Sequence, residues 1–425
     1  MKNFGRPTLL CVICFLSAVF VARGQSVPVE TGSPVYIGYK PPTTNGSLNY
    51  AISAGVRETF GYTQQVPRIT TGDISGNLGF ITPSVRTPTS VLYTGGYVAT
   101  TGPQPSAFFH DLSVNQDFNS RKWKVDLADQ VRYLPDSPAA GINGLVGVGT
   151  TTGTSTTQGS LLPYATRIEN TSNANLSLEL TGKTALDATG LYSIERFPGS
   201  SGGIETNIYA ISGGATHRVN ALHSIGLSYM YSNFAYLGIT GSFVSQGVTA
   251  LYKRQLNRRL VLSLAGGPEY ISASSLTNRP ASWTYNADVT ASYMGSLQHD
   301  LMFTASYKRL TDGGSGLTYG STNDTVTGGV STRITRSLSV DALGTYAHTS
   351  GLQLITAQQL NTQVIIGSVQ ANRAFTRTLS MYVSYTALNQ SLQGTYGSGI
   401  TPLIGLQQVL GFGVTYSPSP VHLGR

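Results

Sequence analysis

The segment TLSMYVSYTALN, residues 378–389, alternates between apolar and polar side chains with a period of two. One face holds Leu379, Met381, Val383, Tyr385 and Ala387, and the other holds Ser380, Tyr382, Ser384 and Thr386. Successive side chains of a β-strand point to opposite faces, so this segment predicts a strand that lies between an apolar and an aqueous environment.

The same alternation recurs along most of the chain. It is clear in Trp123–Tyr133, Leu260–Leu264 and Leu301–Tyr307. Beyond Gln25 no run of about 18 apolar residues occurs, and the helical period of 3.6 residues is hard to find. The sequence therefore predicts an all-β protein.

The composition restricts the class of protein further. Charged residues make up 11% of the 425-residue chain, against about 25% in soluble domains. The chain also has 24 Tyr and 14 Phe, more apolar surface than a disordered chain carries. A soluble β-sandwich array would carry charge on its outer face, and a solenoid would show a fixed repeat, which is absent here. The composition therefore favours a β-protein that lies in a membrane.

The connections between the predicted strands alternate between short and long. Tight turns are expected at Asn119-Ser120, Thr181-Gly182, His217–Asn220, Gln255–Asn257, Gly295–Gln298, Arg336-Ser337 and Thr376-Arg377. Longer polar connections are expected at Pro135–Asn170, Pro198–Gly203, Asn233–Gly238, Ser272–Ser282, Thr311–Asn323, Thr349–Asn361 and Gln390–Ile404. Short turns at one end and long loops at the other are typical of outer-membrane barrels, whose short turns face the periplasm.

The strand count follows from these hairpins. A closing strand is expected at Leu406–Tyr416, and about three more strands precede the first hairpin. The predicted fold is a single transmembrane antiparallel up-and-down β-barrel of about 16–18 strands over residues 48–417. A barrel of this size encloses an aqueous channel unless a loop or domain plugs it, and Pro135–Asn170 is the candidate for such a loop.

The first residues resemble an export signal. Lys2 and Arg6 precede the apolar run Leu9–Ala22, and Ala22-Arg23-Gly24 supplies small residues before a cleavage site at Gln25. The alternative, a transmembrane anchor, needs roughly 18–20 apolar residues. We therefore expect residues 1–24 to be a signal peptide that contains both cysteines, Cys11 and Cys14.

The two ends of the mature chain flank the predicted barrel. Residues 25–47 are rich in proline and are expected to form a periplasmic lead-in, and residues 418–425 a periplasmic tail. Phe412, Val414 and Tyr416 have the aromatic and apolar spacing of the C-terminal signal that the outer-membrane assembly machinery recognises.

The sequence contains no pattern of residues typical of a catalytic or metal-binding site. The histidines are His110, His217, His223, His299, His348 and His422, and they share no ligand spacing. The basic excess is too diffuse to indicate nucleic acid. We expect no enzyme activity, no cofactor and no metal site.

The charged residues predicted to face the pore are the basis for predicting its ion preference. They are Lys122, Lys124, Asp126, Arg132, Lys253, Lys308, Arg333 and Asp341, with Arg373 as a weaker candidate. A mostly basic wall would attract anions, while pairing of these charges with carboxylates across the lumen is the equal alternative. Asp129 falls on the predicted lipid side, which suggests a bulge that shifts the register there.

The phrases Leu92–Tyr97, Val131–Pro135 and Val383–Gln390, together with the strand layout, resemble porin-like outer-membrane β-barrel proteins of uncharacterised function. Some members of that family are associated with exopolysaccharide and protein-sorting systems. The resemblance covers nearly the whole mature chain and implies an outer-membrane location and passage of solutes, but it transfers no site residues.

The sequence thus predicts a passive channel for small hydrophilic solutes in the outer membrane. Its partners would be membrane lipid, lipopolysaccharide and the assembly machinery. The sequence is also compatible with a homo-oligomer. Two alternatives remain at this point: a conduit or accessory barrel for polysaccharide export, and a surface scaffold or adhesin with a plugged lumen.

Overall fold

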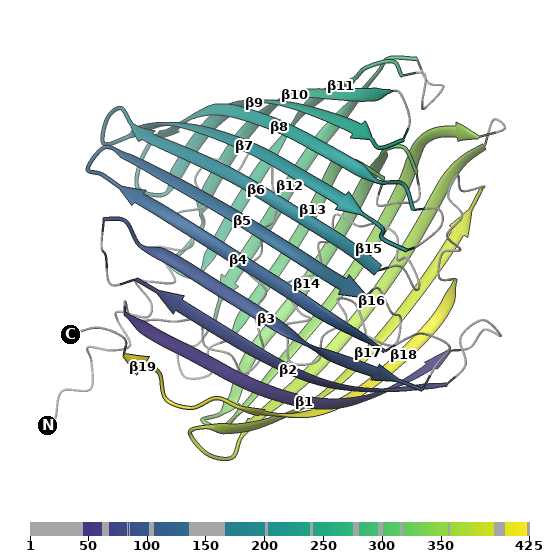
Figure 1. The fold of residues 1–425 in the computed structure, drawn as a ribbon. Helices are drawn as coiled ribbons and strands as arrows, with labels where there is room; N and C mark the ends of the chain where they lie inside the picture. The colour runs from purple at the N-terminus through teal and green to yellow at the C-terminus, as the bar shows by residue number, and fades with distance from the viewer. Residues whose placement is uncertain are drawn as a thin grey trace, which may run out of the picture.

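The chain folds into one closed β-barrel (Figure 1). The computed structural model describes residues 46–61, 68–82, 84, 86–101, 106–135, 166–199, 203–238, 241–274, 280–295, 301–314, 318–355, 358–394 and 404–422. Among these residues no helix is long and apolar enough to cross a membrane. The predicted signal peptide and nearly all of the predicted lead-in lie outside the described residues.

The barrel strands follow one another in chain order. They are β1 (Ser47–Gly61), β2 (Ile69–Ile81), β3 (Thr89–Thr100), β4 (Ala107–Asn119), β5 (Trp123–Pro135), β6 (Thr166–Glu179), β7 (Thr184–Arg196), β8 (Thr206–Arg218), β9 (His223–Tyr236), β10 (Ser242–Gln255), β11 (Leu260–Ile271), β12 (Ser282–Met294), β13 (Met302–Asp312), β14 (Ser321–Thr335), β15 (Leu338–Ile355), β16 (Gln358–Ala374), β17 (Leu379–Gln393) and β18 (Gly405–Tyr416). A further short strand, β19 (Val421–His422), pairs with the start of β1.

Closure comes from pairing of the first and last barrel strands. β1 and β18 are antiparallel, with Cα partners from Ile52↔Tyr416 to Gly61↔Gln407. Every other barrel strand pairs antiparallel with its neighbours in the chain. The predicted all-β antiparallel barrel is therefore confirmed, at the upper count of 18 strands.

The two faces of the wall differ in polarity. On β1 the outward Ile52 and Val56 are 53% and 54% exposed, whereas the inward Ser53 and Arg57 are buried. On β17 the outward residues are Leu379, Met381, Val383, Tyr385 and Ala387, and the inward residues are Ser380, Tyr382, Ser384 and Thr386. Leu388 is an exception, because it is apolar and buried on the inner face. An apolar outer face and a polar inner face are what a barrel in a bilayer requires.

Aromatic side chains gather on the outer face near both ends of the strands. Trp123 and Tyr416 lie at the end with the short turns, and Phe108 and Trp283 lie at the end with the long loops. Rings of this kind mark the two interfaces between a bilayer and water.

The short turns are stabilised locally by their own side chains. The Asn220 side-chain oxygen accepts hydrogen bonds from the amides of Leu222 (2.8 Å) and His223 (2.9 Å). The Asn257 oxygen accepts them from Arg259 and Leu260, both at 2.8 Å. Such turns need no tertiary support, which is why the sequence located them.

The predicted connection at residues 349–361 is wrong. Residues 349–361 were expected to form a long loop, but β15 continues to Ile355 and β16 begins at Gln358. Pairing resumes at Leu354↔Gln359 after a register shift that follows Ser350. The extra strand length places Leu352 in an apolar cluster inside the barrel. Burial of this side chain stabilises the strand, although the sequence of the segment alternates only weakly between apolar and polar residues.

The two-faced wall predicts opposite responses at adjacent positions of β14. Val330 faces outward between Phe303 and Ala342, and Ser331 faces inward beside Asp341. Val330→Arg should lower the free energy of unfolding by roughly 2–4 kcal/mol if it lies near the bilayer midplane, while Ser331→Arg should change it little. Urea unfolding from vesicles measures both values, and equal losses would contradict the assigned faces.

Candidate functional site

The inner wall carries most of the charge of the described strands. Its acidic side chains are Asp73, Asp111, Asp117, Asp126, Glu169, Glu179, Asp187, Glu195, Glu269, Asp288, Asp312 and Asp341, by strand register. Its basic side chains are Arg57, Lys124, Arg132, Arg167, Arg218, Lys253, Lys308 and Arg333. Acidic groups outnumber basic ones, so the expected mostly basic wall is not what the described strands form.

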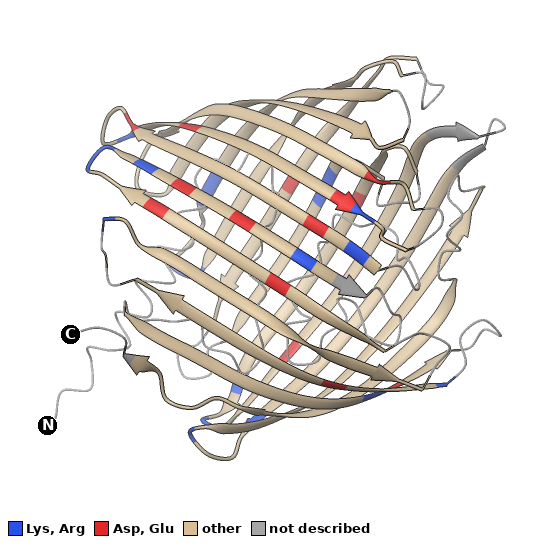
Figure 2. Ribbon diagram, in the orientation of Figure 1, with Lys and Arg blue, Asp and Glu red and all other residues tan. Residues whose placement is uncertain are grey.

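A ladder of alternating charge crosses β4–β7 near the loop end (Figure 2). Arg132 Nε lies 3.4 Å from Asp111 Oδ2, and Arg132 Nη1 lies 3.7 Å from Glu169 Oε2. Arg167 lies 2.9 Å from Glu169 and 3.6 Å from Glu195. We call these residues the charge ladder. Arg132 of β5 bridges carboxylates of β4 and β6, and Arg167 of β6 bridges one carboxylate of its own strand and one of β7. This pairing offsets the cost of removing the charges from water.

A second charged group lies on the same wall toward the short turns. Lys124 Nζ lies 2.9 Å from Asp126 and 3.9 Å from Asp117. The two aspartates are direct partners across β4 and β5. Their side chains are 23–25% exposed, so the group stays in contact with water. Together with the ladder, it gives the wall fixed charges that act on ions nearby.

The predicted pore-facing residues fall into two groups. Lys124, Asp126, Arg132, Lys253, Lys308 and Asp341 share the inward face by register. Lys122 lies in the turn between β4 and β5 instead of on a strand. Arg333 also faces inward by its pairing with Ser339, but it lies beside a register shift at the end of β14 and is exposed. Arg373 faces outward above the ring of Phe375.

Sequence reasoning missed most of the charge ladder. Arg167 and Glu169 lie within the stretch that was assigned to a long loop, although they belong to β6. Asp111 and Glu195 lie on predicted strands, and the alternation of those strands could have placed both on the inner face.

Asp129 faces the membrane side, and no bulge corrects its position. It pairs in unbroken register with Val114 on β4 and Ser172 on β6. The carboxylate accepts hydrogen bonds from Ser172 Oγ at 2.6 Å and Asn170 Nδ2 at 3.1 Å. The suggested slip at this position is therefore wrong, and polar neighbours offset part of the cost of the charge.

A buried ion pair connects the two strands that begin the barrel. Arg57 on β1 and Asp73 on β2 lie 3.3 Å apart, and their side chains are 4% and 1% exposed. The aliphatic part of Arg57 crosses Gly411 of β18, where an added Cβ would lie 3.3 Å from Arg57 Cγ. The absence of a side chain at Gly411 therefore leaves room for this arginine at the closing seam.

Apolar side chains gather inside the barrel at the loop end. This mouth cluster consists of Ile204, Phe234, Tyr236, Phe243, Ile271 and Leu352, with Ile208 and Tyr319 packed against it. The rings of Tyr236 and Tyr319 are 5.1 Å apart, although one lies on β9 and the other between β13 and β14. The connection after β13 therefore reaches the wall formed by β8–β10.

A hydrogen-bonded knot holds the start of that connection. Asp312, at the end of β13, accepts hydrogen bonds from Ser321, from Asn323 and, at 2.8 Å, from the amide of Gly314. Thr349 of β15 donates to Asn323. Because these groups are buried, the knot fixes the position from which Tyr319 reaches the mouth cluster.

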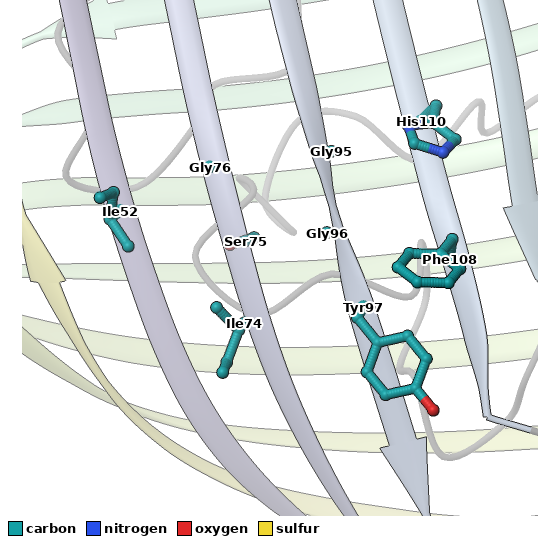
Figure 3. A pocket seen from close by; sticks show the side chains of 9 residues that line it. All are labelled: Ile52, Ile74, Ser75, Gly76, Gly95, Gly96, Tyr97, Phe108 and His110. Carbon is teal, nitrogen blue, oxygen red and sulfur yellow. The ribbon is translucent and has the colours of Figure 1, made fainter.

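A hollow of about 410 Å³ lies on the outer face of β1–β4 (Figure 3). Its walls include Ile52, Tyr97 and Phe108, and Gly76 and Gly95 leave its floor open. The register places these residues on the membrane side. The hollow is therefore separate from the inner wall. In the described part of the chain no cluster of His, Cys, Asp and Glu could hold a metal ion.

No protein-family model matches the sequence, and no curated protein does either. Similar solved structures are outer-membrane porins and transporters. OccAB4 of Acinetobacter baumannii is 10% identical, with 88% of this chain and 98% of that chain covered and a TM-score of 0.44. OccK2 (OpdF) of Pseudomonas aeruginosa is 11% identical, with 87% and 98% covered and a TM-score of 0.43.

The ferric citrate transporter FecA in its unliganded form is 9% identical, with 90% of this chain and 82% of that chain covered and a TM-score of 0.42. The fold of this chain is established by its own closed register of strand pairs.

The Arg57–Asp73 pair predicts strong energetic coupling at the closing seam. Arg57→Met leaves Asp73 as a buried carboxylate that has lost this cation, and it should cost about 3–5 kcal/mol of stability. Arg57→Met/Asp73→Leu should cost less than the sum of the single changes, because neither charge is then isolated. Denaturant unfolding of the wild type, both single variants and the double variant measures the coupling, and strictly additive losses would exclude it.

Proposed function

We propose that this protein is an outer-membrane channel through which small hydrophilic solutes pass passively. The observation that carries the proposal is the inner wall of β5 and β6, where the inward charged and polar side chains, apart from the buried Arg167, are exposed at least in part. The inward residues of β12 are partly exposed as well. A closed barrel with an apolar outer face and a partly hydrated polar inner face supports passage of water-soluble molecules.

The charge balance of the wall supports a preference among solutes. The cations of the charge ladder are each held between carboxylates, and acidic groups exceed basic ones on the described inner face. Rings and clefts of one charge sign concentrate ions of the opposite sign. We therefore propose that small cations and neutral hydrophilic solutes pass more readily than anions.

Ion selectivity tests this proposal. The refolded barrel should give discrete conductance steps in planar bilayers and a zero-current potential that reports cation preference. Asp117→Asn/Asp126→Asn should shift that potential toward anions, because Lys124 then keeps its charge without its carboxylate partners. Asp129→Asn removes an outward carboxylate and serves as the matched control. Anion preference of the wild type, or an equal shift in the control, would contradict the proposed wall.

A plugged or gated barrel is the second candidate function, and specific observations favour it. The inward residues of β1 and β2 are nearly all buried, including Thr59, Thr71 and Ser75. The mouth cluster also joins walls that are far apart in the sheet order. A scaffold or a gated export conduit would need such an occluded lumen.

Conductance of a mouth-cluster variant separates the two candidates. Tyr319→Ala removes a ring that contacts Tyr236, so the conductance or open time should rise above that of the wild type. Tyr209→Ala removes an aromatic ring of the outer face near the same end, where Tyr209 is 49% exposed, and should change neither. Steps that appear only in Tyr319→Ala would favour a gated barrel. If neither the wild type nor Tyr319→Ala conducts ions, although both are folded and heat-modifiable, the proposed channel function is rejected.

A further inference from the structure

Basic side chains gather around the end of the barrel that carries the short turns. The exposed residues in these turns, or at the strand ends beside them and off the inner face, are Arg86, Arg121, Lys122, Lys183, Arg254, Arg258, Arg259, Arg336, Arg373 and Arg377. We call this set the turn-end basic ring. It is distributed over the hairpins from β2–β3 to β16–β17, so it follows most of the circumference.

Few acidic side chains lie beside this ring: Glu179 ends β6, and Asp117 lies two residues before the end of β4, where it contacts Lys124. The described turn residues 82, 84, 86–88, 120–122, 180–183, 219–222, 256–259, 336–337 and 375–378 include no Asp or Glu. Within the described part of the chain, Lys183, Arg258 and Arg336 have no carboxylate within ion-pair distance. The inner wall is different, because the arginines of the charge ladder each contact two carboxylates.

The ring lies where the apolar outer face ends. The Arg373 guanidinium lies 5.5 Å from the centre of the Phe375 ring, on the membrane side. His223 Nδ1 lies 2.9 Å from the Tyr252 hydroxyl on the same face. Interfacial aromatic residues occupy the level of lipid headgroups, and long basic side chains extend from there toward phosphates.

We propose that the turn-end basic ring binds the phosphate-bearing headgroups of anionic phospholipids in the leaflet next to the short turns. Exposed lysine and arginine near an anionic membrane surface attract its headgroups, and the attraction fades within a Debye length. A protein partner would need one compact patch, whereas this charge follows the wall around the barrel, as a shell of lipids does. The inference rests on the proposed membrane location and is independent of solute passage.

The binding is measured with spin-labelled lipids around the reconstituted barrel. In phosphatidylcholine vesicles at about 0.1 M salt, labelled phosphatidylglycerol should be immobilised by the protein roughly fivefold more strongly than labelled phosphatidylcholine. At about 1 M salt, the preference should fall toward one, because the attraction is then screened.

Two matched variants identify the residues responsible. The neutral variant combines Lys122→Gln, Lys183→Gln, Arg258→Gln, Arg259→Gln, Arg336→Gln and Arg377→Gln, and it should lose most of the preference. The charge-retaining variant exchanges Lys and Arg at the same positions and should keep it. Both change exposed side chains and leave the asparagines of the turns intact, and heat-modifiable mobility confirms that each is folded.

Three results would overturn the proposal. The first is equal immobilisation of both lipids by the wild type, and the second is an unchanged preference in the neutral variant. The third is displacement of phosphatidylglycerol by millimolar inorganic phosphate, which would make the ring a general anion site. If the neutral variant keeps the lipid preference and changes only the zero-current potential, the ring acts at the pore entrance and the proposal is overturned. Because lipid immobilisation needs no conductance, a silent barrel would leave this inference standing.

Discussion

Satisfaction of backbone hydrogen bonds inside a bilayer is the constraint on which this structure depends. A sheet in lipid cannot leave an open edge, because each unpaired amide or carbonyl costs several kcal/mol there. The pairing of β1 with β18 removes the edges. Closure also fixes the face of every residue, since a slip by one position would turn all inward side chains toward the membrane. Apart from shifts after Arg333 and after Ser350, the register keeps the inward positions of neighbouring strands on one inner wall.

The inner wall uses its charges in pairs. Arginines such as Arg132 and Arg167 each bridge two carboxylates, and Arg57 lies against Asp73 at the closing seam. Small residues make room for large neighbours, as Gly96 does for Phe109, whose ring would lie 2.6 Å from an added Cβ. The wall is therefore a packed polar surface in some places and a partly hydrated one in others. This difference is what makes both an open channel and a gated barrel worth testing.

The two ends of the barrel are built on different principles. Local hydrogen bonds within a few residues stabilise the short turns, which leaves their lysines and arginines exposed to the surroundings. The loop end depends on distant partners, since the Asp312 knot orients a connection whose Tyr319 reaches Tyr236. One end therefore presents charge to its surroundings, while the other places apolar side chains in the lumen.

The sequence by itself determined the strands, the short turns and the two-faced wall, because a period of two and Asn or Thr turn chemistry are local properties. Segment 378–389 and the turn at Thr181-Gly182 were predictable for that reason. Only the tertiary structure decided that Arg132 meets Asp111 and Glu169, that Arg167 belongs to a strand and that residues 349–355 and 358–361 extend the wall. Cross-strand partners depend on register, and register is fixed only when the whole sheet closes.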